Sequence, residues 1–368
     1  MGMRSFFGRA ARLPAAALGL VLVVCSSFAV AQPVTGSVCT GSNATGSQGN
    51  AAGCSFDSAG LQSTFLSGST TYGSVFSGGM GGGGSGPSGG TSSLGSSRFA
   101  FSTQDTGKAA AGMGSKWNAW ASFSHSELAY QYQPLNSSGH VDLTLLGIDY
   151  TFANNVVAGV AVGWDQTRVG TSFNGGNLRA NGYMVAPYLS WRFTPAWALD
   201  ATLGFGRSNI DQADNSVPGS LTGSYNDRRF LGSLSLAYSK IISKWILTGR
   251  GSYLGSQDRF SQFGLSNGTT VAGNTSHNGQ LRLGGQAMYN GGAVLPYVGA
   301  YYFNNVQQAT QAGVGGTNPA NDRDGFQLQA GIQFAPRGQI YGGLMIASDV
   351  GHREIRNDMI LGNIGIRF

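Results

Sequence analysis

Histidines and carboxylates are the residues of this sequence best suited to acid–base chemistry. The four histidines all lie near predicted loops or strand ends: His125, His140, His277 and His352. Carboxylates occur in the same loops, among them Glu127, Asp322, Asp324 and Asp349. Catalysis needs a base that a third group orients in space, and surface-loop histidines are usually solvated instead. We therefore predict no enzyme activity, no catalytic residues and no cofactor.

Cys39 and Cys54 are the second candidate for chemistry. They lie fifteen positions apart in a stretch rich in Gly, Ser and Asn, and no histidine is near them. The lack of histidine argues against zinc, whereas an oxidising compartment favours a disulfide. We expect a small disulfide loop that contributes roughly 3 kcal/mol to local order, and no metal site.

The first 31 residues predict that the chain is exported. Three arginines precede an apolar centre at Leu13–Val24, and small residues before Ala31 offer a cleavage site between Ala31 and Gln32. This is the pattern of a secretory signal peptide. Cys25 would suggest a lipoprotein, but Val24 precedes it where a small residue is needed. Cleavage lowers the net charge from +6 to +3, and no Lys/Arg run indicates a nucleic-acid partner.

The composition excludes both an ordinary soluble domain and a bundle of transmembrane helices. Of 368 residues 60 are Gly, and only 10% are charged, against about 25% charged in average soluble domains. Yet the mean hydropathy is only -0.06, and no run of 18 apolar residues occurs. Apolar and polar residues must therefore be interleaved.

Residues 32–97 are expected to be mostly disordered. Ser77–Ser97 contains ten Gly and seven Ser in 21 residues, which behaves as a flexible coil without apolar surface to bury. This segment is either a tether or short exported segment, or low-complexity filler.

Residues 116–368 have the alternation of a membrane β-barrel. In Gly325–Phe334, for example, every second residue from Phe326 is Phe, Leu, Ala or Ile, and the residues between them are Gln and Gly. Successive side chains of a strand point to opposite faces, so one wall is apolar and the other polar. We predict twelve strands, at 116–125, 141–152, 156–167, 178–193, 197–208, 227–240, 244–255, 277–290, 293–303, 323–335, 338–349 and 355–368.

Loop lengths and aromatic positions distinguish this barrel from a soluble sandwich. Connections alternate between tight turns, as at 153–155 and 194–196, and longer polar loops. Aromatics such as Trp191 and Trp197 gather at the tight turns. Short periplasmic turns, an even strand number and an aromatic girdle are typical of outer-membrane barrels. The fold class we predict is an all-β, 12-stranded antiparallel transmembrane barrel, preceded by a disordered Gly/Ser-rich segment.

Four segments carry a resemblance to a known family. They are WNAWASFSH at 117–125, LLGIDYTFANNVVAGVAVGW at 145–164, YMVAPYLSWRFTPAWALDATLGFG at 183–206, and the ending ILGNIGIRF. In this order and spacing they resemble the translocator β-domain of autotransporters, the type V secretion proteins.

The resemblance implies a monomeric barrel in the outer membrane lipid of a Gram-negative bacterium. It implies that residues 98–115 thread the pore. It also implies that the outer-membrane barrel assembly machinery reads the last strand, with Ile364, Ile366 and Phe368 as the signal. Family members usually export a long passenger, whereas here only about 60 to 80 residues without a repeat precede the barrel.

Charged residues within strands are expected to face the lumen, because charge is rarely placed in lipid. The candidates are Arg192, Asp200, Arg250, Arg282 and Arg367. They either line a pore and hold the threading segment, or form salt-bridged packing within a plugged barrel.

The leading hypothesis is that the barrel carries its own short N-terminal segment to the cell surface. The alternatives are a porin-like channel and a surface structural or adhesive protein. An adhesin would bind through long loops, such as 209–226 or 256–276.

Overall fold

The computed structural model describes residues 117–368 apart from nine short gaps. The gaps are 132–136, 153–155, 173–174, 216–219, 269, 272, 308–323, 335–338 and 352–354. The expected signal peptide with its Ala31–Gln32 site, the Cys39–Cys54 pair and the threading segment 98–115 all lie outside the described residues. Within the described ranges, no helix is long and apolar enough to cross a membrane.

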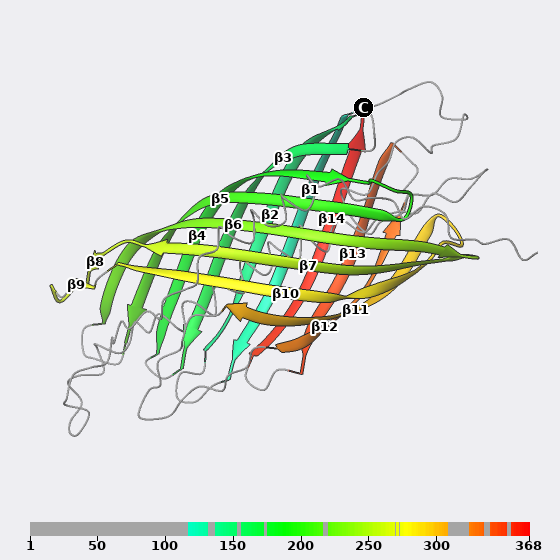
Figure 1. The fold of residues 1–368 in the computed structure, drawn as a ribbon. Coiled ribbons are helices and arrows are strands. Elements are labelled where there is room, and N and C mark those ends of the chain that lie inside the picture. The colour runs from blue at the N-terminus through cyan, green and yellow to red at the C-terminus, as the bar shows by residue number, and fades with distance from the viewer. Residues whose placement is uncertain are drawn as a thin grey trace, which may run out of the picture. The chain divides into compact units, whose positions relative to one another are not determined.

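Twelve antiparallel strands form a closed barrel, as predicted, with each strand paired to its neighbours in the chain (Figure 1). They are β1 (Trp117–Tyr130), β2 (Ser137–Phe152), β3 (Val156–Thr171), β4 (Gly176–Trp191), β5 (Trp197–Asp214), β6 (Leu221–Ile242), β7 (Trp245–Phe260), β10 (Asn274–Tyr289), β11 (Val294–Gln307), β12 (Asp324–Phe334), β13 (Ile340–Val350) and β14 (Ile355–Arg367). A small hairpin, β8 (Phe263–Gly264) and β9 (Thr270–Val271), lies in the connection between β7 and β10.

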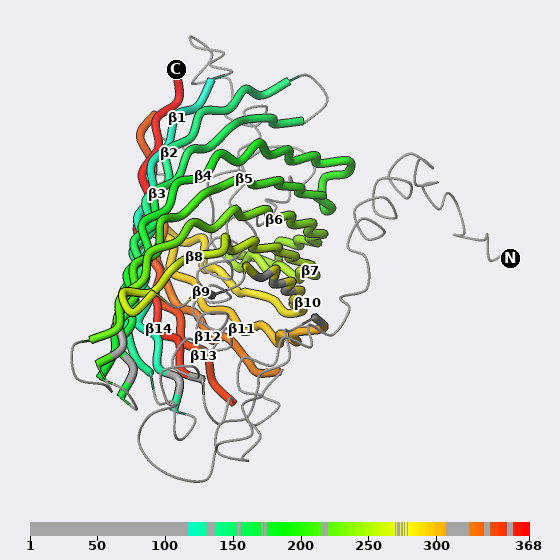
Figure 2. Tube along the Cα trace, turned by 90° about the vertical axis from the view of Figure 1, so that its left-hand side faces the viewer, coloured from blue at the N-terminus to red at the C-terminus, as the bar shows by residue number. Residues whose placement is uncertain are grey.

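The barrel closes where its last strand meets its first, and Figure 2 shows β14 beside β1. The register runs from Asn118 opposite Arg367 to Tyr130 opposite Ile355. Trp117 and Phe368 exchange backbone hydrogen bonds of 3.3 and 3.0 Å. The two ends of the barrel polypeptide therefore lie together, at the end that carries the tight turns.

Alternation gives most strands one buried and one exposed wall. In β4 the pattern is strict from Gly176 to Ser190, with each buried residue followed by an exposed one. The exposed residues are apolar over most of the strand length, and the predicted face of β12 is confirmed, since Phe326 is 50% and Leu328 49% exposed. An apolar outer wall around a polar interior is the arrangement that lipid requires.

Strand ends lie within two residues of the prediction at the tight turns and differ by more at several positions of the opposite end. There, β2 begins at residue 137 rather than 141, and β6 begins at 221 rather than 227. At that end the alternation of apolar and polar residue types weakens along the sequence while the backbone ladder continues, although the inward face of β6 stays buried from Leu221 to Asp227. The turn between β6 and β7 is Ser243–Lys244, not 241–243, and Ser243 takes the left-handed backbone conformation with φ of 55°.

Candidate functional site: the barrel interior

Hydrogen-bonding side chains line most of the barrel interior. Because every second residue of each strand points inward, serines, threonines, glutamines and charged groups from most strands share one enclosed space. Buried examples are Ser122 on β1, Thr167 on β3 and Gln286 on β10. Such groups must find partners when they leave water, and three networks supply them.

The seam network joins five interior residues from four strands. Trp120 donates its indole N–H to the Tyr188 hydroxyl (2.9 Å), and Tyr188 donates to Asp149 (2.9 Å). Asn118 also donates to Asp149 (3.0 Å), and Tyr341 donates to Asn118 (2.8 Å). Because β13 and β2 lie on opposite sides of the β1–β14 seam, this chain of bonds fastens the barrel where it closes.

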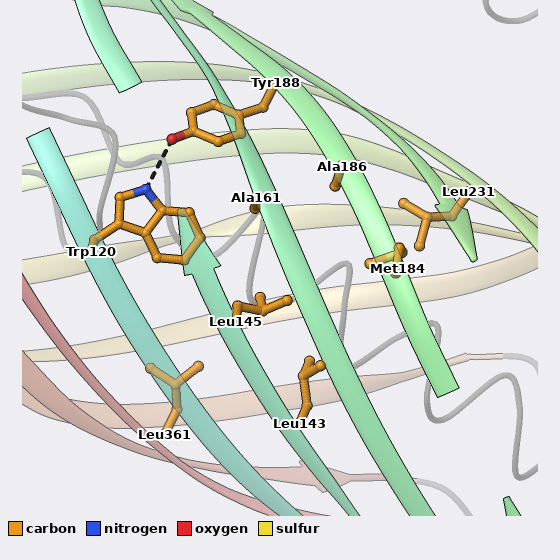
Figure 3. Packing of buried hydrophobic residues seen from close by; sticks show 9 residues of the cluster. All are labelled: Trp120, Leu143, Leu145, Ala161, Met184, Ala186, Tyr188, Leu231 and Leu361. Atoms are coloured by element: carbon orange, nitrogen blue, oxygen red, sulfur yellow. Dashed lines mark hydrogen bonds between the residues drawn. The ribbon is translucent and has the colours of Figure 1, made fainter. Parts of the chain in front are cut away.

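An apolar cluster packs beside the seam network. Trp120 and Tyr188 pack with buried aliphatic residues, and Figure 3 shows the indole pointing toward the Tyr188 hydroxyl. The other members are Leu143, Leu145, Ala161, Met184, Ala186, Leu231 and Leu361. Gly147 makes room for the indole ring, since a Cβ atom at this position would overlap Trp120.

A cluster of one arginine and three aspartates, the Arg229 cluster, lies inside the barrel. It is near the strand ends that lie opposite the tight turns. The Arg229 guanidinium lies 2.8 Å from Asp258, 3.6 Å from Asp227 and 3.9 Å from Asp165. All four side chains are buried. Two strands, β4 and β5, separate Asp165 on β3 from Arg229 on β6, so the Arg229–Asp165 ion pair bridges non-adjacent strands of the wall.

A third network surrounds Arg282, one of the predicted lumen-facing residues. Its guanidinium donates to Gln280 (2.6 Å) and Gln327 (3.2 Å). Gln327 donates to Asp349 (2.9 Å), which also accepts a hydrogen bond from Asn357 (2.9 Å). These bonds link β10, β12, β13 and β14 across the interior.

The other four predicted lumen residues occupy different depths. Asp200 is buried and accepts a 2.6 Å hydrogen bond from Ser190, and Arg250 is buried as well. Arg367 is half-buried, with its guanidinium 4.8 Å from the centre of the Tyr341 ring. Arg192 lies in the tight turn after β4 and is half-buried.

Some charged atoms of the interior have no hydrogen-bond partner among the described residues. Among them are Nε and Nη2 of Arg250, Nη2 of Arg282 and Oδ2 of Asp200. Because leaving a buried charged atom without a partner costs free energy, these atoms are available to a further polar group inside the barrel.

The outer wall carries the histidines that sequence reasoning considered for catalysis. His125 lies on β1, and its Nδ1 is 2.6 Å from Asp142 on β2. The His140 ring lies beside the His125 ring, with centroids 5.6 Å apart and planes tilted by 31°. No group of three or more metal-ligating side chains occurs in the described ranges. His277 lies on β10, and His352 is outside the described residues.

The predicted assembly signal lies on the outer wall of β14 and at the residue that follows it. Ile364 and Ile366 are exposed on β14, and Phe368 is exposed directly after it. All three point toward the surroundings of the barrel, on the same face as Ile360.

Residues 119–344, more than half of the chain, match the autotransporter β-domain family. The chain belongs to this family. The barrel of this autotransporter β-domain is therefore a protein of the outer membrane of a Gram-negative bacterium. No curated protein matches the sequence.

Solved autotransporter domains share the fold of this β-domain. The translocator domain of the autotransporter NalP from Neisseria meningitidis is 12% identical, with a TM-score of 0.60 over 70% of this chain and 90% of that one. The β-domain of the Bordetella autotransporter BrkA is 16% identical, with a TM-score of 0.58 over 69% and 100%. The transport unit of AIDA-I from Escherichia coli is 14% identical, with a TM-score of 0.51 over 73% and 93%.

Proposed function

We propose that this autotransporter β-domain carries the N-terminal part of its own chain across the outer membrane to the cell surface. The observation that supports this most is the pairing of Trp117 with Phe368 at the end with the tight turns. In outer-membrane barrels the short turns are periplasmic. The preceding chain therefore joins the barrel on the periplasmic side, and the interior is the route from there to the surface.

The chemistry of the interior also supports the proposal. Residues 98–115 contain Ser, Thr, Gln and Asp, and a backbone inside the barrel needs hydrogen-bonding partners as strongly as a buried side chain does. The guanidinium nitrogens of Arg250 and Arg282 that have no hydrogen-bond partner among the described residues can donate to the carbonyl groups of that backbone. We place residues 98–115 in the interior, and the signal peptide 1–31 directs the chain to the periplasm.

Assembly is the second part of the proposal. The last strand is read by the barrel assembly machinery through its exposed outer face, in which Ile364, Ile366 and Phe368 present a row of apolar side chains. A periplasmic-side aromatic at the chain end, held by backbone bonds to Trp117, supports this role.

Conductance across a planar lipid bilayer tests the translocator against a constitutive pore. Three proteins are compared: residues 32–368, a deletion of 32–97, and a deletion of 32–115. If residues 98–115 fill the interior, the first two conduct weakly and the third conducts strongly. Equal and stable conductance of all three would contradict the proposal and favour a porin-like channel.

A further inference from the structure

Three arginines lie directly opposite one another on the outer wall. Arg207 on β5 is paired in register with Arg228 on β6, and Arg228 is paired with Arg259 on β7. All three side chains are exposed. We call these residues the arginine row. Directly opposed like charges on adjacent strands destabilise a sheet, so a run of three calls for an explanation.

The arginine row begins where the lipid-facing wall ends. Phe205 and Phe230, two residues nearer the periplasmic turns on β5 and β6, face each other with ring centroids 5.3 Å apart. Phe205 is 54% exposed. Girdles of aromatic residues flank the apolar band of outer-membrane barrels at both interfaces, so Arg207 and Arg228 lie at the level of the outer-leaflet headgroups.

No carboxylate of the described residues neutralises the arginine row. Each of its members lacks a hydrogen bond or ion pair to any other described residue. The neighbouring Arg229 shows the contrast, because it points inward and has Asp258, Asp227 and Asp165 within 4 Å. The same sequence segment thus pairs its inner arginine with three acids and leaves its outer arginine with none.

A second opposed pair extends the positive charge around the barrel. Arg168 on β3 lies directly opposite Arg179 on β4, and both are exposed. Among the described residues, Arg168 donates only to the neutral Gln166 (3.2 Å). The outer wall from β3 to β7 therefore carries five exposed arginines immediately above the apolar surface, and Asp211 on β5, directly opposite Arg179, is an acid among them.

We propose that the arginine row binds the phosphate groups of phosphorylated lipid in the outer leaflet of the outer membrane. Guanidinium groups bind phosphate oxygens through paired N–H donors, and a phosphate between opposed arginines turns their repulsion into attraction. The apolar wall below, with Phe205 and Phe230, holds the acyl chains of the same lipid. A lipid anion is therefore the occupant that matches both the charge and the adjoining apolar surface.

Binding of lipid A to the full-length mature protein in an uncharged detergent tests this site. Native mass spectrometry compares bisphosphorylated lipid A with dephosphorylated lipid A of the same acyl chains. We expect the phosphorylated lipid to bind at least about tenfold more tightly, and the triple variant R207Q/R228Q/R259Q to lose that preference. The matched control K240Q/K244Q/R356Q removes three positive charges elsewhere on the barrel. We expect this variant to keep the preference for the phosphorylated lipid.

Measurements of the unfolding temperature provide a second test of the site, which does not depend on lipid A binding by the triple variant. In detergent without lipid A, R228Q raises the unfolding temperature because it relieves repulsion, whereas with lipid A it lowers the temperature relative to the wild type. Equal binding of the two lipids, or a triple variant that keeps the preference, would overturn the proposal. Displacement of lipid A by an equal concentration of inorganic phosphate would show a free-phosphate site and overturn the lipid assignment.

Discussion

Tyr341 on β13 donates a 2.8 Å hydrogen bond to the side-chain oxygen of Asn118 on β1, across the intervening strand β14, although the two residues lie 223 positions apart. Both side chains are buried. The bond therefore forms only when the first strand and the last two strands are assembled. It ties the folded state of the barrel to its closure.

Removing the Tyr341 hydroxyl tests the contribution of this bond. Y341F leaves the Asn118 oxygen buried without its donor, so we expect the free energy of unfolding to fall by about 1–3 kcal/mol. Urea unfolding of the refolded barrel in detergent measures the change. Y183F is the control, because Tyr183 is exposed on the outer wall; an equal loss in both variants would contradict the role of the seam.

Gly147 tests the packing beside the seam. A Cβ atom there overlaps the Trp120 indole, so G147A displaces the ring and weakens its hydrogen bond to Tyr188. Overpacking of this kind costs about 1–3 kcal/mol, measured by urea unfolding. G249A is the matched control, because a Cβ atom at Gly249 meets nothing within 4 Å. A wild-type stability for G147A would show that the indole is free to move.

The adjacent arginines Arg228 and Arg229 give a test of inward and outward charge. R229Q leaves Asp227 and Asp258 buried without their cation, and breaking a buried ion pair costs about 3–5 kcal/mol. R228Q removes an outward charge and is expected to leave the barrel as stable as the wild type or more so in uncharged detergent. Urea unfolding of both variants distinguishes them, and the reverse order of stability would refute the assigned faces.

Phe368 tests the assembly signal. F368S is expected to reduce the amount of folded barrel in the outer membrane of cells, while refolding of the purified chain from urea stays efficient. F334S, at the periplasmic end of β12 where Phe334 is also exposed, is the control. Loss of refolding in F368S to the same extent as loss in cells would assign Phe368 a purely structural role.

The sequence predicts the membrane-spanning part of the fold well, because lipid imposes a strict alternation there. The twelve strands, their order and their periplasmic ends follow from that pattern and from tight turns such as 194–196. Above the lipid the constraint disappears. The outer extension of β6 from 227 to 221, and the hairpin of β8 and β9, therefore leave no signal in the sequence.

The interior networks are harder to foresee, since their members meet only through closure. Asn118 and Tyr341 lie far apart in the sequence, and nothing in the pattern indicates that they meet. Nor does the sequence distinguish the buried Trp120 from the aromatic residues of the outer wall. The Arg229 cluster is different, because alternation places Asp227 and Arg229 on one face of β6. The predicted strand 227–240 already contains that pair, so the same rule places both side chains inside, but it does not bring them together with Asp165 on β3.

Surface exposure of the N-terminal segment is the most direct test of the translocator account. An epitope tag is inserted near Thr45, and intact cells are probed with antibody before and after external protease. We predict a surface signal that protease removes while the barrel stays intact. A tag that antibody detects only after the outer membrane is permeabilised would contradict translocation.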